Sequence, residues 1–276
     1  MIVYLDVNHL SRLARSPNDP TCVEFLNLLV GTRSQIGLSF FHIHEISNPK
    51  FVSRPTVGAL LDKLPVLWAP FLDEVFDREI EWAFDYALTD QIVVRTVFNR
   101  SFLHVFGAPE NADIPVSQMI EETSMAPELR TFIIDAAEHG RKLDETMKRQ
   151  AAAIRDPNLP ILERIRREPL TRTRGGLDLV VPYQPEELLH RVGGLEAFPS
   201  YCISQGLTVL RLNDERYKTE RNDLLDEWHA CYTPYVDLML LDKKTVARYR
   251  NAKLPYQDRV YSRLEDAVQQ MRARTA

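Results

Sequence analysis

The first ten residues, MIVYLDVNHL (residues 1–10), decide the fold class of this chain. Residues 1–5 form an apolar run with β-branched and aromatic side chains, which predicts a buried strand that starts at the first residue. This strand ends at Asp6, and the apolar spacing over residues 8–14 is helical. A strand that leads through an acidic residue into a helix is typical of an α/β sheet, and it places a carboxylate at the carboxyl end of the strand.

The alternation of strand and helix continues outward from this stretch and returns near the C-terminus. A helix over 21–30, a strand over 36–41 and a helix that starts close to Glu45 come next. Later in the chain, the expected strands cover residues 207–212, 236–241 and 259–262, and the expected helices cover residues 222–231, 245–250 and 264–274. We therefore predict an α/β fold in which residues 1–50 and 205–276 build one central parallel sheet flanked by helices.

The middle of the chain, residues 51–204, has a different pattern. It predicts a mostly helical insertion or lobe, whose first part is a further candidate for completing the core. The expected helices cover residues 57–64, 71–88, 127–154, 161–167 and 185–192. The best strand candidate in this region is residues 177–181.

Composition and charge exclude several classes of protein. The net charge of −5 argues against coating nucleic acid through global charge, so a polyanionic partner needs a local basic patch or cations held on acidic side chains. The three cysteines are widely spaced and form no CxxC pair, which argues against a zinc knuckle or a disulfide framework. The chain also has no secretion signal and no apolar run near the roughly 18–20 residues of a membrane span. These features predict a cytoplasmic protein without a membrane partner.

Acidic residues recur where the expected strands end or helices begin. They are Asp6, Glu45, Asp223 with Asp226, and Asp242. In open parallel sheets, ligands gather beyond the carboxyl ends of the strands. Carboxylates that meet there repel one another unless a positive charge lies between them, and Mg²⁺ and Mn²⁺ are cations that prefer oxygen ligands.

The third acidic position stays open between two residues. Asp223 has an alternative role at its helix start, where its side chain can accept from a free backbone N–H. Asp226 lies on the helix face opposite the apolar residues of 222–231, so packing does not explain it, and we favour Asp226.

These blocks together resemble the PIN (PilT N-terminus) nuclease family. Tyr4-Leu-Asp6-Val-Asn8 is similar to the D-x-N start of that family, and Ser39 with Glu45 is similar to its second block. The segments DLLDEWH (223–229) and PYVDLMLLDK (234–243) resemble its third and fourth blocks. Two positions differ, because the family often has Thr or Ser where Leu240 stands and an acid where Lys244 stands.

The resemblance implies a PIN-like three-layer fold and a metal-dependent nuclease, most often a ribonuclease. Its implied catalytic residues are Asp6, Glu45, Asp223 or Asp226, and Asp242, and the implied metal ligands are Asp6, Glu45, Asp226 and Asp242. Mg²⁺ or Mn²⁺ would activate water for attack on a phosphodiester, with Asn8 orienting a water or a carboxylate. The implied partner is nucleic acid, RNA first, and the resemblance leaves open an antitoxin-like protein, as in bacterial toxin–antitoxin pairs, or a second copy of this chain.

Several other residues have two interpretations. The basic residues Arg164, Arg166, Arg167, Arg172 and Arg174 lead into Gly175-Gly176 and could follow a nucleic-acid backbone or form a solvated surface. Lys243 could reach a phosphate or simply begin a helix. His229 could touch substrate or a carboxylate, or be a hydrogen-bonded core residue, and Asp237 could be a ligand or a strand-edge residue. His42 and His44 lack the partners of a zinc site.

Two other functions compete with the nuclease. The altered fourth block favours a catalytically weak or inactive PIN-like module that binds nucleic acid or a protein. A haloacid-dehalogenase-like phosphatase would need a second acid two residues after its nucleophile, where this chain has Asn8.

Overall fold

The centre of the molecule is a five-stranded parallel sheet with the strand order β3-β2-β1-β4-β5. The computed structural model describes residues 1–48, 50–89, 96–100, 114–125, 131, 134–135, 137–142, 198–213 and 218–274. The strands are β1 (Ile2–Leu5), β2 (Gln35–Ser39), β3 (Val66–Ala69), β4 (Leu238–Leu240) and β5 (Val260–Tyr261). β1 is the middle strand and pairs with β2 from its own half of the chain and with β4 from the far end. The predicted parallel α/β sheet is therefore confirmed.

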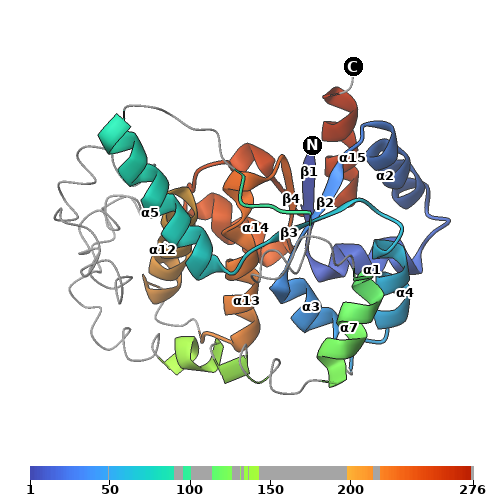
Figure 1. Ribbon diagram of the computed structural model, residues 1–276, viewed down its shortest axis with the longest axis horizontal. Helices are drawn as coiled ribbons and strands as arrows, with labels where there is room; N and C mark the ends of the chain where they lie inside the picture. Colours follow the sequence, from blue (N-terminus) through green and yellow to red (C-terminus); the bar gives the residue numbers. More distant parts are fainter. Residues whose placement is uncertain are drawn as a thin grey trace.

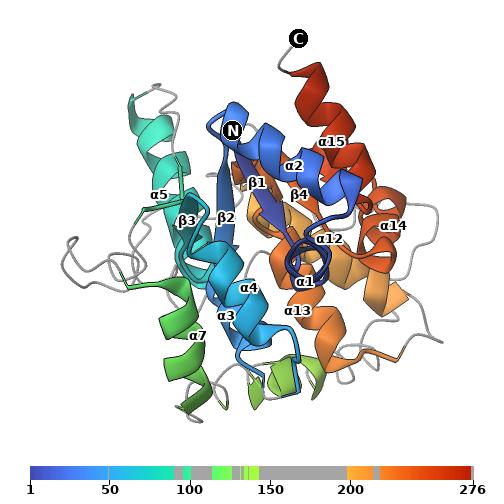
Figure 2. The ribbon, with the colours of Figure 1, turned by 90° about the vertical axis from the view of Figure 1, so that its right-hand side faces the viewer.

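Helices cover both faces of this sheet (Figures 1 and 2). One face carries α1 (Val7–Arg15), α2 (Pro20–Gly31), α4 (Arg54–Leu61), α7 (Val116–Met125) and α15 (Leu264–Ala273). The other carries α5 (Leu72–Thr89), α12 (Pro199–Asn213), α13 (Arg221–Ala230) and α14 (Lys243–Asn251). The short elements are α3 (Phe40–Ile46), η4 (Thr233–Tyr235) and η5 (Gln257–Arg259). Within the described ranges, no helix combines the length and apolar character needed to cross a membrane.

Two separate apolar cores result from the alternation of side chains along the strands. Val3 and Leu5 of β1 point into the core beneath α1, α2 and α15, whereas Tyr4 between them points into the core beneath α12, α13 and α14. All three side chains are fully buried. Because both faces of the sheet are covered, β1 is an unbroken apolar run rather than an alternating one.

The strand predicted over residues 207–212 is wrong, because these residues belong to helix α12. This helix packs against α5, α13, α14 and η4, so it is buried over most of its circumference. Leu207 and Val209 are buried, and Leu210 is partly buried. A helix surrounded in this way loses the one-sided apolar spacing by which sequence patterns reveal helices.

Strand β3 was not predicted from the sequence. Its four residues lie between Pro65 and Pro70, and the register aligns Leu38 of β2 with Trp68 of β3. A strand this short, buried at three of its four positions, has too few residues to show a period. The sheet therefore extends into the segment after residue 50.

The other predicted elements can be compared where the structure describes them. The strands over 1–5, 36–41, 236–241 and 259–262 are confirmed as β1, β2, β4 and β5, each within a few residues. Of the helix expected over 127–154, residues 137–142 are helical. The helices expected over 161–167 and 185–192 and the strand over 177–181 lie outside the described residues.

Candidate metal centre

Asp6 and Asp242 occupy equivalent places at the carboxyl ends of two neighbouring strands. Asp6 follows β1 and caps α1, with Oδ1 accepting from the His9 amide at 3.0 Å. Asp242 follows β4 and caps α14, with Oδ1 accepting from the amides of Lys244 and Thr245 at 2.7 and 3.1 Å. The Asp6 amide donates to the carbonyl of Leu240 at 2.9 Å, so both carboxylates lie at the same sheet edge. Each cap fixes one carboxylate oxygen and leaves the other without a hydrogen bond from any described residue.

Glu45 reaches the same edge from the helix that follows β2. Ser39, the last residue of β2, caps α3, and Glu45 lies in the last turn of that helix. Its side chain is 26% exposed, and its Oε2 atom lies 3.7 Å from Nε2 of His229. Three chain segments that are far apart in sequence thus bring carboxylates to one edge of the sheet.

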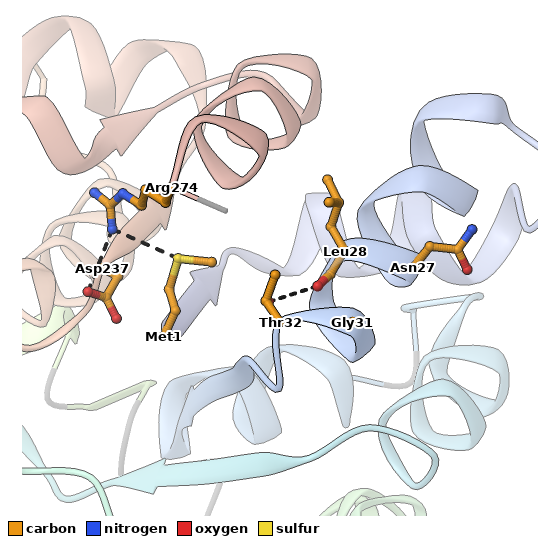
Figure 3. Close-up of a pocket in the computed structure, with 7 residues that line it drawn as sticks. All are labelled: Met1, Asn27, Leu28, Gly31, Thr32, Asp237 and Arg274. Carbon is orange, nitrogen blue, oxygen red and sulfur yellow. Dashed lines mark hydrogen bonds and ion pairs between the residues drawn. The ribbon is translucent and has the colours of Figure 1, made fainter. Parts of the chain in front are cut away.

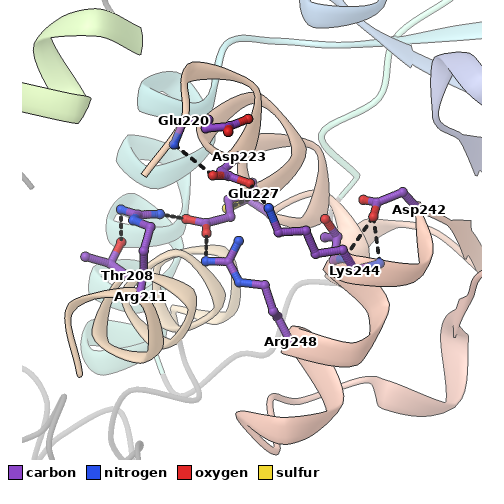
Figure 4. Close-up of polar contacts among 10 residues, drawn as sticks. Thr208, Arg211, Glu220, Asp223, Glu227, Asp242, Lys244 and Arg248 are labelled. Carbon is purple, nitrogen blue, oxygen red and sulfur yellow. Dashed lines mark hydrogen bonds and ion pairs between the residues drawn. The ribbon is translucent and has the colours of Figure 1, made fainter. Parts of the chain in front are cut away.

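Helix α13 carries three acids, and two of them have cation partners (Figure 4). Asp223 accepts from the Glu220 amide at 2.8 Å and pairs with Nζ of Lys244 at 2.5 Å. Glu227 is buried and pairs with both Arg211 and Arg248. Asp226 has no hydrogen bond or ion pair from its side chain to any residue that the structure describes. Of the two candidates for the third position, Asp223 is therefore already neutralised and Asp226 is not.

The electrostatics show that the remaining acids act on one another. Burial raises the pKa of Asp226 to about 7, and the charges of Asp242, Glu45 and Asp6 contribute to the rise. Burial also raises the pKa of Asp6, with a further contribution from Glu45. These contributions place Asp242, Glu45 and Asp6 within electrostatic range of Asp226, and His229 partly offsets their effect.

His229 lies beside these acids and belongs to a buried polar network. Its Nδ1 atom is 2.6 Å from the Tyr4 hydroxyl, which is also 2.8 Å from Oγ of Ser39. His42 continues the network, because its Nδ1 accepts from the Ser39 amide at 3.0 Å and its Nε2 donates to the Leu5 carbonyl at 2.7 Å. Burial lowers the pKa of His42 well below its ordinary value. Both ring nitrogens of His42 are therefore occupied, which leaves none for a zinc ion.

The pKa of His229 is shifted in the opposite direction. Burial by itself disfavours its charged form, but Glu45, Asp226 and Asp6 outweigh burial and raise the pKa above the ordinary value. Its Nε2 atom is buried and has no hydrogen-bond partner. A buried polar atom left in this way requires a physical explanation, and a bound ion is one of the accepted ones.

The donor chemistry of this edge fits a hard divalent cation. Asp6, Glu45, Asp226 and Asp242 offer carboxylate oxygens, the ligands that Mg²⁺ and Mn²⁺ prefer. Within the described part of the chain, however, no three His, Cys, Asp or Glu side chains already form a group that could hold a metal ion. Binding of a cation by this set would therefore require its carboxylates to turn toward a common point.

The other residues that the sequence singled out do not belong to the group of four carboxylates. Asn8 is exposed on the first turn of α1, and Lys243 is exposed at the start of α14. Asp237 precedes β4, at the opposite edge of the sheet, where it accepts from the Ile2 amide at 2.7 Å. Arg164, Arg166, Arg167, Arg172 and Arg174 lie outside the described residues.

A pocket of about 740 Å³ opens near Asp237, remote from the acidic cluster (Figure 3). Met1, Thr32 and Arg274 line it, and Arg274 lies 3.6 Å from Asp237. This pocket is at the amino end of β1, whereas Asp6 and the acids near it lie at the carboxyl end. Its position gives it no part in the chemistry of those acids.

The role of Tyr4 was not predicted from the sequence. Its signal was the one hydroxyl within the apolar run of β1, because a buried tyrosine usually finds a hydrogen-bond partner. The partners themselves, Ser39 and His229, come from β2 and α13 and depend on the tertiary structure.

Comparison of the chain with protein-family models, with curated proteins and with solved structures finds no match. The assignment of a function therefore depends on the chemistry of the site.

Proposed function

We propose that this chain is a PIN-like, metal-dependent nuclease that hydrolyses phosphodiester bonds, with RNA as the first substrate to test. The observation that carries the proposal is Asp226, a partly buried carboxylate that forms no ion pair with any described residue, although it lies close enough to Asp242, Glu45 and Asp6 for their charges to add to the rise in its pKa that burial causes. An uncompensated acid beside three others is costly to maintain, and a bound divalent cation offsets this cost.

In this proposal Asp6, Glu45, Asp226 and Asp242 hold Mg²⁺ or Mn²⁺. Asp6 and Asp242 contribute the oxygens that their helix caps leave unbonded, so each carboxylate is held in place by the backbone before the ion arrives. Asp223 does not serve as a ligand, because Lys244 neutralises it. When bound, the cation supplies a lower pKa for a nucleophilic water and neutralises charge on the leaving oxygen.

The surroundings of the acids also suit a phosphate backbone. α1 and α14 both begin at this edge, and the N-terminus of a helix attracts anions through its free amides and its dipole. Lys243 is exposed on the first turn of α14, where it could contact a phosphate. The three described cysteines are free, which fits a reducing cytoplasmic location.

Labelled single-stranded RNA and DNA, incubated with Mn²⁺, with Mg²⁺ and with chelator, test the proposal. We expect the wild type to cleave only with a cation, and Asp6→Asn and Asp226→Asn to lose more than about a hundredfold in rate, because a ligand matters more than its outer-shell support. Asp223→Asn is the matched control on the same helix and should stay within about tenfold of the wild type. Cleavage that persists in chelator, or equal losses in Asp223→Asn and Asp226→Asn, would contradict the proposed site.

The second candidate function is a weak or inactive PIN-like module that binds nucleic acid or a protein partner. It is favoured by Lys244, which stands where the resembled family often has an acid, and by the absence of an assembled ligand group among the described residues. RNA binding that survives Asp6→Asn, without cleavage by either protein, would support this module and exclude the nuclease.

A further inference from the structure

His229 is held rigidly at the edge of the acidic cluster. It is 1% exposed, and its ring packs against those of His42, Phe41 and Tyr4 at centroid distances of 4.7, 5.7 and 5.7 Å. The Tyr4 hydroxyl fixes Nδ1 at 2.6 Å. The ring therefore has one orientation, in which Nε2 lies 3.7 Å from Oε2 of Glu45 without a hydrogen bond.

The spacing between His229 and Glu45 fits two ligands of one ion better than a hydrogen bond. The 3.7 Å separation exceeds hydrogen-bond length. Two donors bonded to the same cation at roughly 2.1 Å each lie about 3–3.6 Å apart, so only a small movement of Glu45 would bring both onto one ion.

The hydrogen-bond network can present a free lone pair at Nε2. The Leu5 carbonyl only accepts, so His42 carries its proton on Nε2 and accepts at Nδ1. Tyr4 can then donate to Ser39, and Nδ1 of His229 to Tyr4. Histidines that bind metals typically donate their second ring N–H to such an outer-shell partner.

We propose that Nε2 of His229 is a direct ligand of the divalent cation, which makes this a mixed nitrogen–oxygen site that favours Mn²⁺ over Mg²⁺. The inference rests on the proposed function, since it takes the same four carboxylates as the oxygen ligands. Mg²⁺ is a hard cation that selects oxygen, whereas an imidazole ligand shifts the preference toward transition metals. The carboxylates that otherwise favour a proton on His229 are those that the bound ion would neutralise.

Pulsed electron paramagnetic resonance of the Mn²⁺-loaded full chain tests this directly. With [¹⁵N]histidine incorporated, the wild type should show coupling between Mn²⁺ and an imidazole nitrogen. His229→Asn keeps a polar group near the Nδ1 position for Tyr4 but lacks Nε2. It should therefore lose the coupling and bind Mn²⁺ at least about tenfold more weakly, with a smaller loss for Mg²⁺.

Two further variants separate the outcomes. His229→Gln places an oxygen near the Nε2 position, so it should bind Mn²⁺ without nitrogen coupling. If His229→Asn fails to fold, His229→Gln provides the same test for loss of the coupling. His9→Gln, in the neighbouring helix α1, should keep the coupling. Mn²⁺ bound by the wild type without histidine coupling, or coupling that persists in both His229 variants, would overturn the role of His229 while leaving the carboxylate site intact. A wild type that binds no Mn²⁺ would overturn both proposals.

Discussion

Nζ of Lys244 lies 2.5 Å from Oδ1 of Asp223, and this ion pair decides which acids of α13 remain available for a cation. The Asp223 side chain is 5% exposed and that of Lys244 is 53% exposed, so the pair closes over the buried carboxylate from the solvent side (Figure 4). One lysine on α14 thus neutralises Asp223, whereas Asp226 forms no ion pair with a residue in the described part of the chain.

Reversing the charge of residue 244 should strengthen cation binding at the acidic cluster. In Lys244→Glu, Asp223 loses its ion pair with Lys244 and a further carboxylate joins the edge, so we expect Mn²⁺ affinity to rise about tenfold. The metal-free protein should lose roughly 1–3 kcal/mol of unfolding free energy, because a charge-assisted hydrogen bond to a buried acid is removed. Calorimetric Mn²⁺ titration and urea unfolding measure the two effects. Lys243→Glu makes the same charge change at the neighbouring exposed residue, and an equal gain in that variant would refute a local cause.

The pH dependence of stability should report on Asp226. Its pKa rises from 3.8 to about 7 on folding, chiefly through burial, so the neutral form is favoured in the native state. The stability that comes from protonated Asp226 is fully present below about pH 4 and is lost as the pH rises through about 7. Above that pH, the deprotonated side chain lowers the free energy of unfolding by roughly 2–4 kcal/mol. In chelator, Asp226→Asn should therefore match the wild type near pH 4 and become more stable above pH 7.

Urea unfolding of both proteins from pH 4 to pH 9 tests this expectation. The difference between them is the informative quantity, because it cancels the titration of other groups such as His42. Asp19→Asn should show no such gain at high pH, because the Cys22 amide lowers the pKa of that carboxylate and so favours its charged form. An Asp226→Asn protein that is less stable than the wild type at pH 8 would rule out an uncompensated charge at this position.

Removing the Tyr4 hydroxyl should weaken both the fold and the candidate metal centre. Tyr4→Phe leaves Nδ1 of His229 without its partner in a buried location, which should cost about 1–3 kcal/mol. Mn²⁺ affinity should also fall about tenfold or more, because an outer-shell partner orients its ligand. Tyr249→Phe is the matched control, since that buried hydroxyl donates to the Pro255 carbonyl instead. If both variants changed Mn²⁺ affinity equally, the Tyr4 network would have no specific role.

The packing of α12 can be checked by two leucine substitutions. Leu207 is fully buried between the helices on its face of the sheet, whereas Leu210 is partly buried. We expect Leu207→Ala to cost about 2–5 kcal/mol in unfolding free energy and Leu210→Ala less than half as much. Denaturant unfolding gives both values, and the reverse order would contradict the packing of α12.

Local pattern was sufficient where a few consecutive residues specify the element. The apolar run of β1 and the acidic residues after β1 and β4 follow from short segments, because a strand buried on both faces is apolar throughout and a helix start favours an aspartate cap. Asp6 and Asp242 were predictable for the same reason, whereas Glu45 and Asp226 were singled out by the resemblance of their segments to the PIN family.

Pattern failed where distant partners define the element. The first amides of α12, at Ser200 and Tyr201, donate to the carboxylate of Glu79 in α5, so this helix is capped by a residue more than a hundred positions earlier. The sequence of residues 199–213 does not indicate that cap. Because the helix is buried on nearly all sides, its apolar residues also lack a one-sided helical spacing.

The sequence by itself determined the parallel α/β class and the acids at the carboxyl ends of the strands, because short local patterns of apolar and acidic residues indicate both. Only the tertiary structure decided that Lys244 neutralises Asp223, that Asp226 has no such partner among the described residues, and that Tyr4 aligns His229 beside Glu45. These are pairings between side chains from different helices and strands, and their energies depend on burial and distance, which a linear pattern does not contain.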